Sequence, residues 1–456
     1  MNFNIRLGVI SFALFCFCAD VHQIVAQQKK VPFAVDRVVQ AQAIVVDKNK
    51  EENLRKDLPV NNFRALGLDD LISRSLATHP RLGKAGFVVE QAKGYHYQAG
   101  LYPNPVLNLV GDELGDVQGP VGILTIPGIS QEIVTASKLS LGQAVAAKEV
   151  DGANLRLLEE RYELIGSIRA QYIAVICLQR RAQVYADLVQ LTETATKNSQ
   201  ALFENNLLPK LALLRQEVAL ERIRAEELAI SAQLVAAFQA LAAVAGDLQL
   251  PPQLLGSLLD QPVPVYDADQ LRSVVLQIHP RVRRFQVEIE QRTAQLAKAN
   301  ADVIPNVTVS TGYVYQGQNK SHDWTLGVSV PIPSWNRNEG NIFAARMGIH
   351  IAQKQLEVVQ LELAEGVAKT YQDYAAGLAK VKQYQEKILP RIEDLYQQSL
   401  KAFQQGQLPF NDITLVQQNL VNTRLEFLQE QERAWQAAAR LSALLMEDQW
   451  PPARQK

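Results

Sequence analysis

The side chains best suited to chemistry are few and scattered. The cysteines are Cys16 and Cys18, inside an apolar N-terminal stretch, and Cys177, which is left without an intramolecular disulfide partner or a Cys-based zinc site. No His-Glu-x-x-His motif, phosphate loop, nucleophile elbow or pair of catalytic carboxylates is present. The histidines are His22, His79, His96, His279, His322 and His350. The sequence therefore predicts no metal site, no cofactor and no enzyme activity.

Two of these histidines precede proline. The residue before a proline is held out of helical conformation, so we expect His79 and His279 to have a structural role near helix starts.

Charge and composition narrow the class of protein. The chain has 46 basic and 47 acidic residues and no basic block, so a nucleic-acid partner is not expected. With 24 Gly, 20 Pro and 7% aromatic residues in 456, the composition favours long helices over an all-β fold.

The N-terminus has the pattern of an export signal. Residues 1–26 contain Arg6, an apolar run at residues 9–18 and the small Ala26 at a cleavage position. The run is shorter than the ~20 residues of a membrane-spanning helix, and we expect no such helix later in the chain. A lipid anchor on Cys18 is an alternative that the flanking phenylalanines disfavour. Residues 27–64 are interpreted as a linker or extended arm.

The remainder is a tandem duplication. Residues 71–82 (LISRSLATHPRL) match residues 271–282 (LRSVVLQIHPRV) at six of twelve positions, an offset of 200. The same offset relates Leu208-Pro209 to Leu408-Pro409. We place the first repeat at residues 65–250, a connecting segment at 251–268, the second repeat at 269–447 and a tail at 448–456.

Each repeat shows a helical pattern, a Pro-Asn break, two strand-like runs, a very long helical pattern, a Leu-Pro turn and another helix. No proline interrupts residues 128–208, and a helix over 139–205 would be ~100 Å long. After each Leu-Pro turn apolar residues follow heptads, which indicates coiled-coil seams. An ordinary helical bundle core is the alternative, and the helix length argues against it. The seam residues include Leu213, Leu220, Leu234, Leu241, Ile413, Leu420, Phe427 and Leu441.

The strand-like runs have one apolar and one small, polar face. Strands are expected at about 307–315 and 324–332, with the aromatic residues Tyr313, Tyr315 and Trp324 near the connecting loop. A membrane β-hairpin needs this pattern, with aromatic rings at the lipid interface. A soluble hairpin with one buried face is the alternative. The first repeat has a more ragged pair, at about 106–113 and 121–133.

Two hairpins supply four strands per chain. The smallest membrane barrels use eight, and open sheet edges cannot face lipid. A barrel would therefore be shared among several chains.

Together the duplication, the Pro-Asn breaks, the Leu-Pro turns and the junctions GISQEIVTASKLSLGQAVAAK (128–148) and GVSVPIPSWNRNEGNIFAAR (327–346) resemble the TolC-like outer-membrane efflux proteins. The similarity spans roughly residues 65–447.

The resemblance implies a mainly α-helical fold with a small membrane β part. Four strands per protomer would form a 12-stranded barrel in a homotrimer, continued by a helical tunnel in the periplasm. The expected function is the passive exit duct of a tripartite efflux or type I secretion-like system. Its partners would be a periplasmic adaptor, an inner-membrane pump of the RND type and outer-membrane lipid.

In such proteins the helical tips close the periplasmic entrance. Here the tips would be residues 205–210 and 405–411, with the gate candidates Leu208, Pro209, Gly406, Leu408 and Pro409. The resemblance also makes Asp412 a candidate for a ring of carboxylates that holds cations. An equal alternative is that Asp412 caps the helix beginning there.

A rival hypothesis is a periplasmic coiled-coil scaffold without a membrane barrel. The two differ in the role of the alternating faces at 307–315 and 324–330. The residues leave the cargo open among drugs, metal ions and polypeptides.

Overall fold

The computed structural model describes residues 66–112, 123–206, 208–317, 320–405 and 407–451. The chain divides into two units, residues 1–63 and 64–456. The expected export signal and arm lie outside the described residues, all of which belong to the second unit.

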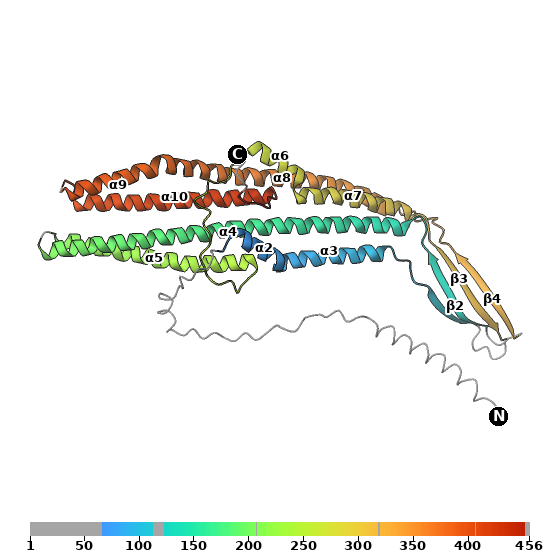
Figure 1. The fold of residues 1–456 in the computed structure, drawn as a ribbon. Helices are drawn as coiled ribbons and strands as arrows, with labels where there is room; N and C mark the ends of the chain where they lie inside the picture. Colours follow the sequence, from blue (N-terminus) through green and yellow to red (C-terminus); the bar gives the residue numbers. More distant parts are fainter. Residues whose placement is uncertain (1–65, 113–122, 207, 318–319, 406, 452–456) are drawn as a thin grey trace, which may run out of the picture. The chain divides into compact units, whose positions relative to one another are not determined.

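The described chain runs twice through the same order of elements (Figure 1). The first series is α2 (Leu68–Thr78), α3 (Pro80–Ala99), β1 (Val106–Asp112), β2 (Ile123–Ile133), α4 (Lys138–Glu204) and α5 (Lys210–Ala245). The second is α6 (Ala268–Ile278), α7 (Pro280–Ala301), β3 (Val307–Gln316), β4 (Ser321–Ser329), α8 (Glu339–Gln383), the π turn η3 (Tyr384–Ile388), α9 (Leu389–Gln404) and α10 (Phe410–Leu444). The expected mainly helical fold with four strands is confirmed.

The repeated His-Pro-Arg motif caps α3 and α7. His79 Nδ1 accepts a hydrogen bond from the backbone N–H of Arg81 at 3.1 Å, and His279 does the same for Arg281 at 3.2 Å. Each proline occupies a first-turn position, where its missing N–H costs nothing. Burial lowers the pKa of His279 to about 4, which keeps its ring neutral and able to accept. The expected structural role of both histidines is confirmed.

The four strands form one antiparallel sheet in the order β1-β2-β3-β4. Register shifts between Asn108 and Val110 in the β1–β2 pair and between Thr125 and Gly128 in the β2–β3 pair mark bulges around the first hairpin. A bulge reverses the alternation of side chains beyond it, which explains the ragged sequence pattern there. Strand β4 begins at Ser321 and ends at Ser329, both three residues earlier than expected.

The helices pack in the same order as the strands to which they connect. Beside the sheet, α3 contacts α4, α4 contacts α7, and α7 contacts α8. In the other half, α5 contacts α4, α4 contacts α10, and α10 contacts α8 and α9. Figure 1 shows α4 and α5 side by side and α9 and α10 side by side.

The main core lies around the middle of α4. Ile168, Ile173 and Cys177 are fully buried there, and Trp435 of α10 is buried in the same cluster. Two tyrosines secure the segment that connects the repeats. Tyr172 donates to the carbonyl of Gly256 at 2.8 Å, and Tyr374 donates to the carbonyl of Pro264 at 2.7 Å.

A buried arginine ties the segment after α10 to this core. Arg169 donates to Ser442 Oγ at 2.9 Å and to the carbonyl of Asp448 at 3.0 Å, and its guanidinium lies over the Trp450 ring. Trp450 Nε1 donates to Tyr266 Oη at 3.1 Å, and Tyr266 donates to Glu447 at 3.0 Å. Burial lowers the pKa of Arg169 and raises the pKa of Glu447.

The two long helices differ. Helix α4 runs unbroken over 67 residues, whereas its counterpart is divided into α8, η3 and α9. The very long helical pattern expected in the second repeat is therefore present, but a π turn interrupts its α-helical hydrogen bonding. Pro390 explains the break, since it has no N–H to donate to the carbonyl four residues earlier.

Among the described residues, α5 is the one helix long and apolar enough to span a membrane by length and composition, with a window of mean hydropathy 1.9. No helix of this length and apolar character was expected from the sequence. In the structure α5 lies along α4 and buries Leu213, Leu220 and Ile230. Its apolar character is that of a packed coiled-coil helix with further apolar residues on its exposed side.

Two glycines of α8 predict opposite effects of substitution. A Cβ at Gly377 would lie 3.1 Å from the backbone of Ala434, whereas no atom lies within 4 Å of a Cβ at Gly366. We expect Gly377→Leu to lower the free energy of unfolding by about 1–3 kcal/mol through overpacking. Gly366→Ala should raise it by about 0.5–1 kcal/mol because it restricts the unfolded backbone. Circular dichroism during thermal unfolding measures both, and shifts in the same direction would contradict the close α8–α10 contact.

Candidate functional site

The two faces of the sheet differ in chemistry. Directly paired residues of antiparallel strands place their side chains on the same face. The apolar face carries the pairs Tyr313–Trp324, Thr311–Leu326 and Val309–Val328, together with Ile129 and Leu107. Trp324, Leu326, Val328, Ile129 and Leu107 are all exposed in the single chain. The alternation in the sequence predicted one apolar face on β3 and one on β4. The pairing register places both on the same face of the sheet.

The opposite, polar face carries small and hydrogen-bonding side chains. Its pairs include Thr308–Ser329, Ser310–Gly327 and Ser130–Ser310. Asn108 Nδ2 donates to Ser130 Oγ at 3.0 Å across β1 and β2. One face thus suits contact with hydrocarbon and the other contact with water.

The three aromatic residues named from the sequence cluster at the loop end of the apolar face. The rings of Tyr313 and Trp324 are 5.8 Å apart and nearly perpendicular. His322 lies between Tyr313 and Tyr315, with ring separations of 5.7 and 5.3 Å, and its Nδ1 is hydrogen-bonded to the Tyr313 hydroxyl. His322 was not expected in this cluster from the sequence. The role of this cluster at a membrane interface stays a prediction.

A polar knot joins the repeats where the sheet meets the helices. Asn306 Oδ1 accepts from Lys138 Nζ at 2.7 Å and from the Thr135 backbone at 3.2 Å, and its Nδ2 donates to Glu132 at 2.6 Å. Thr135 Oγ1 donates to the carbonyl of Pro305 at 2.7 Å. The Pro-Asn break was visible in the sequence, but the partners of Asn306, about 170 residues away, were not.

We expect Asn306→Leu to lower the free energy of unfolding by about 2–3 kcal/mol. The substitution leaves the half-buried ammonium of Lys138 and carboxylate of Glu132 without this partner, and hydrogen bonds to charged groups carry most of the cost. Asn154→Leu, on the exposed surface of α4, is the matched control and should stay within about 0.5 kcal/mol. Equal thermal unfolding midpoints for the two variants would contradict a structural role of the knot.

The Leu-Pro turns form the tips of two helical hairpins. Helix α4 ends at Glu204 and α5 begins at Lys210; α9 ends at Gln404 and α10 begins at Phe410. Pro209 and Pro409 take the extended conformation just before their helices, and Leu208 and Leu408 are half-buried. Gly406 lies outside the described residues. The structure thus places the gate candidates it describes at the tips, and their gating role stays a prediction.

The helix-cap interpretation of Asp412 is wrong. Pro409 holds the cap position of α10, and Asp412 lies in the first turn, exposed and without a capping hydrogen bond from its side chain. A carboxylate there still interacts favourably with the helix dipole, but its oxygens are free to face an ion.

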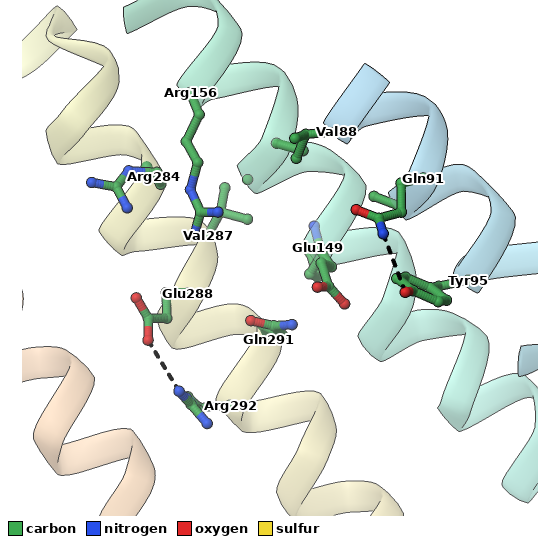
Figure 2. A pocket seen from close by; sticks show the side chains of 14 residues that line it. Val88, Gln91, Tyr95, Glu149, Arg156, Arg284, Val287, Glu288, Gln291 and Arg292 are labelled. Atoms are coloured by element: carbon green, nitrogen blue, oxygen red, sulfur yellow. Dashed lines mark hydrogen bonds and ion pairs between the residues drawn. The ribbon is translucent and has the colours of Figure 1, made fainter. Parts of the chain in front are cut away.

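A charged hollow lies between α3, α4 and α7 (Figure 2). Its volume is about 220 Å³, and Tyr95, Arg156, Arg284, Glu288 and Arg292 line it. Arg292 pairs with Glu288 at 3.2 Å, one turn away on α7. No sequence motif had indicated this hollow.

The positive charge of Arg284 is only partly neutralised in this hollow. It faces Glu159 at 3.7 Å and stacks over Phe285, and burial lowers its pKa while raising the pKa of Glu159. An ion pair that has little exposed surface and joins neighbouring helices helps to hold those helices in register. Within the described ranges, no group of three or more His, Cys, Asp or Glu is placed to hold a metal ion.

The family model for the outer membrane efflux protein matches residues 271–446. The cobalt-zinc-cadmium resistance protein CzcC of Cupriavidus metallidurans is 24% identical over 387 residues, 83% of this chain and 90% of that protein. The nickel-cobalt-cadmium resistance protein NccC of Alcaligenes xylosoxydans is 24% identical over 296 residues, 64% of this chain and 66% of that protein. The outer membrane protein VceC of Vibrio cholerae superposes with a TM-score of 0.66 at 18% identity, over 83% of this chain and 95% of that chain.

Residues 271–446 thus carry the outer membrane efflux protein domain, and the chain has the fold of the TolC-like channels. It is similar over most of its length to outer-membrane channels whose helical part lies in the periplasm. The periplasmic scaffold without a barrel is therefore set aside.

Proposed function

We propose that three copies of this chain form the exit duct of a tripartite system that exports divalent metal cations. The sheet supplies four of twelve barrel strands, and the helices supply one third of a tunnel wall. The duct conducts passively and carries out no chemical reaction, because the pump supplies the energy. The observation that carries the proposal is that, among the described residues, the sheet and both halves of the helical layer end at unpartnered edges on corresponding sides.

The strand edges are compatible with ring closure. Because each neighbouring pair in the order β1-β2-β3-β4 is antiparallel, β1 and β4 run in opposite directions. Strand β4 of one copy can therefore pair with β1 of the next in the same antiparallel manner. In lipid this closure is required, because unpaired backbone groups have no water to bind.

The helices at the edges of the layer carry apolar side chains that stay exposed in the single chain. Next to the sheet the layer ends at α3, with exposed Phe87, and at α8, with exposed Ile351 and Leu361. In the other half it ends at α5, with exposed Leu211 and Val218, and at α9. Exposed apolar side chains along these edges fit an interface, and a head-to-tail contact between unlike edges closes a ring.

The family supports an adaptor and an inner-membrane pump as partners, and we propose a pump of the RND type. The relatives CzcC and NccC are named for resistance to cobalt, zinc, nickel and cadmium, which favours divalent cations over drugs or polypeptides as the cargo. The carboxylate of Asp412, at the second tip of each copy, would suit such a cargo.

Deleting the gene in its own host tests the cargo. We expect the tolerated concentration of Co²⁺, Zn²⁺ or Cd²⁺ to fall while drug tolerance stays unchanged, and re-expression of the chain to restore it. Loss of drug tolerance alone would overturn the metal assignment. Conductance of the purified protein in a planar bilayer tests the duct itself, and a protein that produces no conductance steps would contradict it.

Substituting Asp412 tests the proposed ring of carboxylates. Asp412→Asn removes three negative charges around the axis, so we expect the concentration of Co²⁺ that half-blocks the channel to rise about tenfold, equivalent to about 1.4 kcal/mol. Asp373→Asn, an exposed carboxylate of α8 far from the tips, is the control and should leave block unchanged. Equal block of wild type and Asp412→Asn would rule out the ring.

A further inference from the structure

The charged hollow between α3, α4 and α7 is lined by residues of both repeats (Figure 2). Four basic and two acidic side chains line it: Lys148, Arg156, Arg284, Arg292, Glu149 and Glu288. The lining therefore carries two more positive than negative charges. An excess of one sign in a concave site attracts ions of the other sign.

Two of the basic groups are already neutralised. Arg292 pairs with Glu288 at 3.2 Å within α7. Lys148 pairs with Glu290 at 2.8 Å and with Asp151 at 3.4 Å. The charges that remain for a ligand are therefore those of the other two arginines.

Arg156 and Arg284 lie on neighbouring helices without a close acidic partner. Arg156 is exposed and forms no ion pair with any residue that the structure describes. Arg284 approaches Glu159 only to 3.7 Å, and its buried Nε has no hydrogen-bond partner. Burial lowers the pKa of Arg284, and the positive charge of Arg156 lowers it further. An anion between the two guanidinium groups would relieve their repulsion.

We propose that the charged hollow binds a small oxyanion of the size of phosphate between Arg156 and Arg284. In Figure 2 Arg156 extends from α4 toward α7 and ends beside Val287, one turn from Arg284. Guanidinium groups bind oxyanions through two N–H donors at once. The Tyr95 hydroxyl accepts from Gln91 Nε2 at 3.3 Å, which leaves its hydrogen available as a further donor.

The size and position of the hollow decide which kind of anion fits. Its volume of about 220 Å³ is below the ~300–1,000 Å³ of pockets that take drug-sized ligands. Arg156 is 18 residues beyond Lys138, the first residue of α4, which places it ~27 Å along the helix from the sheet. The proposed barrel puts that sheet in the bilayer, so a free anion fits this site better than a lipid headgroup.

A bound anion would join the two repeats. The hollow lies where α4 of the first repeat packs against α7 of the second. An oxyanion held by Arg156 on one helix and Arg284 on the other would therefore stabilise this contact. The site is complete within one chain, so the inference does not depend on the proposed ring or its cargo.

Isothermal titration calorimetry of the purified full-length protein with inorganic phosphate, at an ionic strength fixed with sodium chloride, tests the site. We expect saturable binding to the parent protein and a higher thermal unfolding midpoint in phosphate. Arg156→Gln should weaken binding about 10- to 100-fold, because it removes a charged hydrogen-bond donor. Arg284→Gln should do the same, and if that variant fails to fold the Arg156→Gln result still decides.

Two further variants separate a site from general attraction of anions. Arg222→Gln removes an exposed, unpaired arginine from α5 and should leave phosphate binding unchanged. Glu149→Gln removes an exposed carboxylate from the lining and should strengthen binding. No saturable binding to the parent protein, or equal affinities of the parent and Arg156→Gln, would overturn the site. Equal losses with Arg156→Gln and Arg222→Gln would overturn it as well.

Discussion

Leu326→Arg should abolish assembly in the outer membrane, at a cost of about 2–4 kcal/mol for a cation near the bilayer midplane. Leu326 lies near the middle of the apolar face, opposite Thr311. The next pair on that face is the aromatic pair Tyr313–Trp324. Its side chain is 78% exposed in the single chain, so nothing within the chain covers it. In the proposed barrel this side chain faces lipid.

The neighbouring residue provides the control. Thr325 pairs with Gly312 on the polar face, where a lumen filled with water would accept a guanidinium. Thr325→Arg should therefore assemble at close to wild-type levels. The amount of each variant recovered from the outer-membrane fraction measures the difference. If Leu326→Arg assembled normally while Thr325→Arg did not, the two faces would have been assigned the wrong way round.

Trp435→Ala should lower the free energy of unfolding by about 3–5 kcal/mol, the range for removing a buried aromatic side chain. Trp435 has no exposed surface, and its ring meets that of Trp450 edge to face at 5.5 Å. It lies in the core that joins α4, α8 and α10, so the cavity would loosen both repeats at once.

Trp435→Phe separates packing from hydrogen bonding. The Nε1 of Trp435 has no hydrogen-bond partner, so phenylalanine should lose part of the packing and no polar contact. We expect a loss smaller than that of Trp435→Ala in thermal unfolding followed by circular dichroism. A Trp435→Phe variant as unstable as Trp435→Ala would indicate that a polar role had been missed.

Local sequence patterns predicted those features that repeat or alternate within a short stretch. The 200-residue offset identified the duplication, and the alternation at Tyr313, Tyr315 and Trp324 located the second hairpin and its aromatic cluster. The His-Pro-Arg motif gave the starts of α3 and α7, because the residue before proline and the first helical turn are both constrained locally.

Features that depend on partners distant in the chain were missed. Asn306 is an ordinary polar residue until the fold brings Glu132 and Lys138 to it. Arg169 lies among helix formers, and only the fold shows that it binds the segment around Asp448. Periodicity within a segment carries no information about such contacts.

Three features of the structure that were not predicted do have a local signal in the sequence. Pro390 lies within the second long helical pattern and marks the π turn that divides it. The bulges of the first hairpin include one beside Pro127, a residue that cannot continue a regular ladder. For Asp412, locating the helix start two residues earlier, at Phe410, would have removed the cap interpretation.

Single-particle electron microscopy of the purified, detergent-solubilised protein tests the central claim most directly. We predict particles with threefold symmetry, in which β4 of each copy pairs with β1 of the next and a continuous passage runs along the axis. A particle containing a single chain, or a ring whose centre is filled along its whole length, would contradict the account.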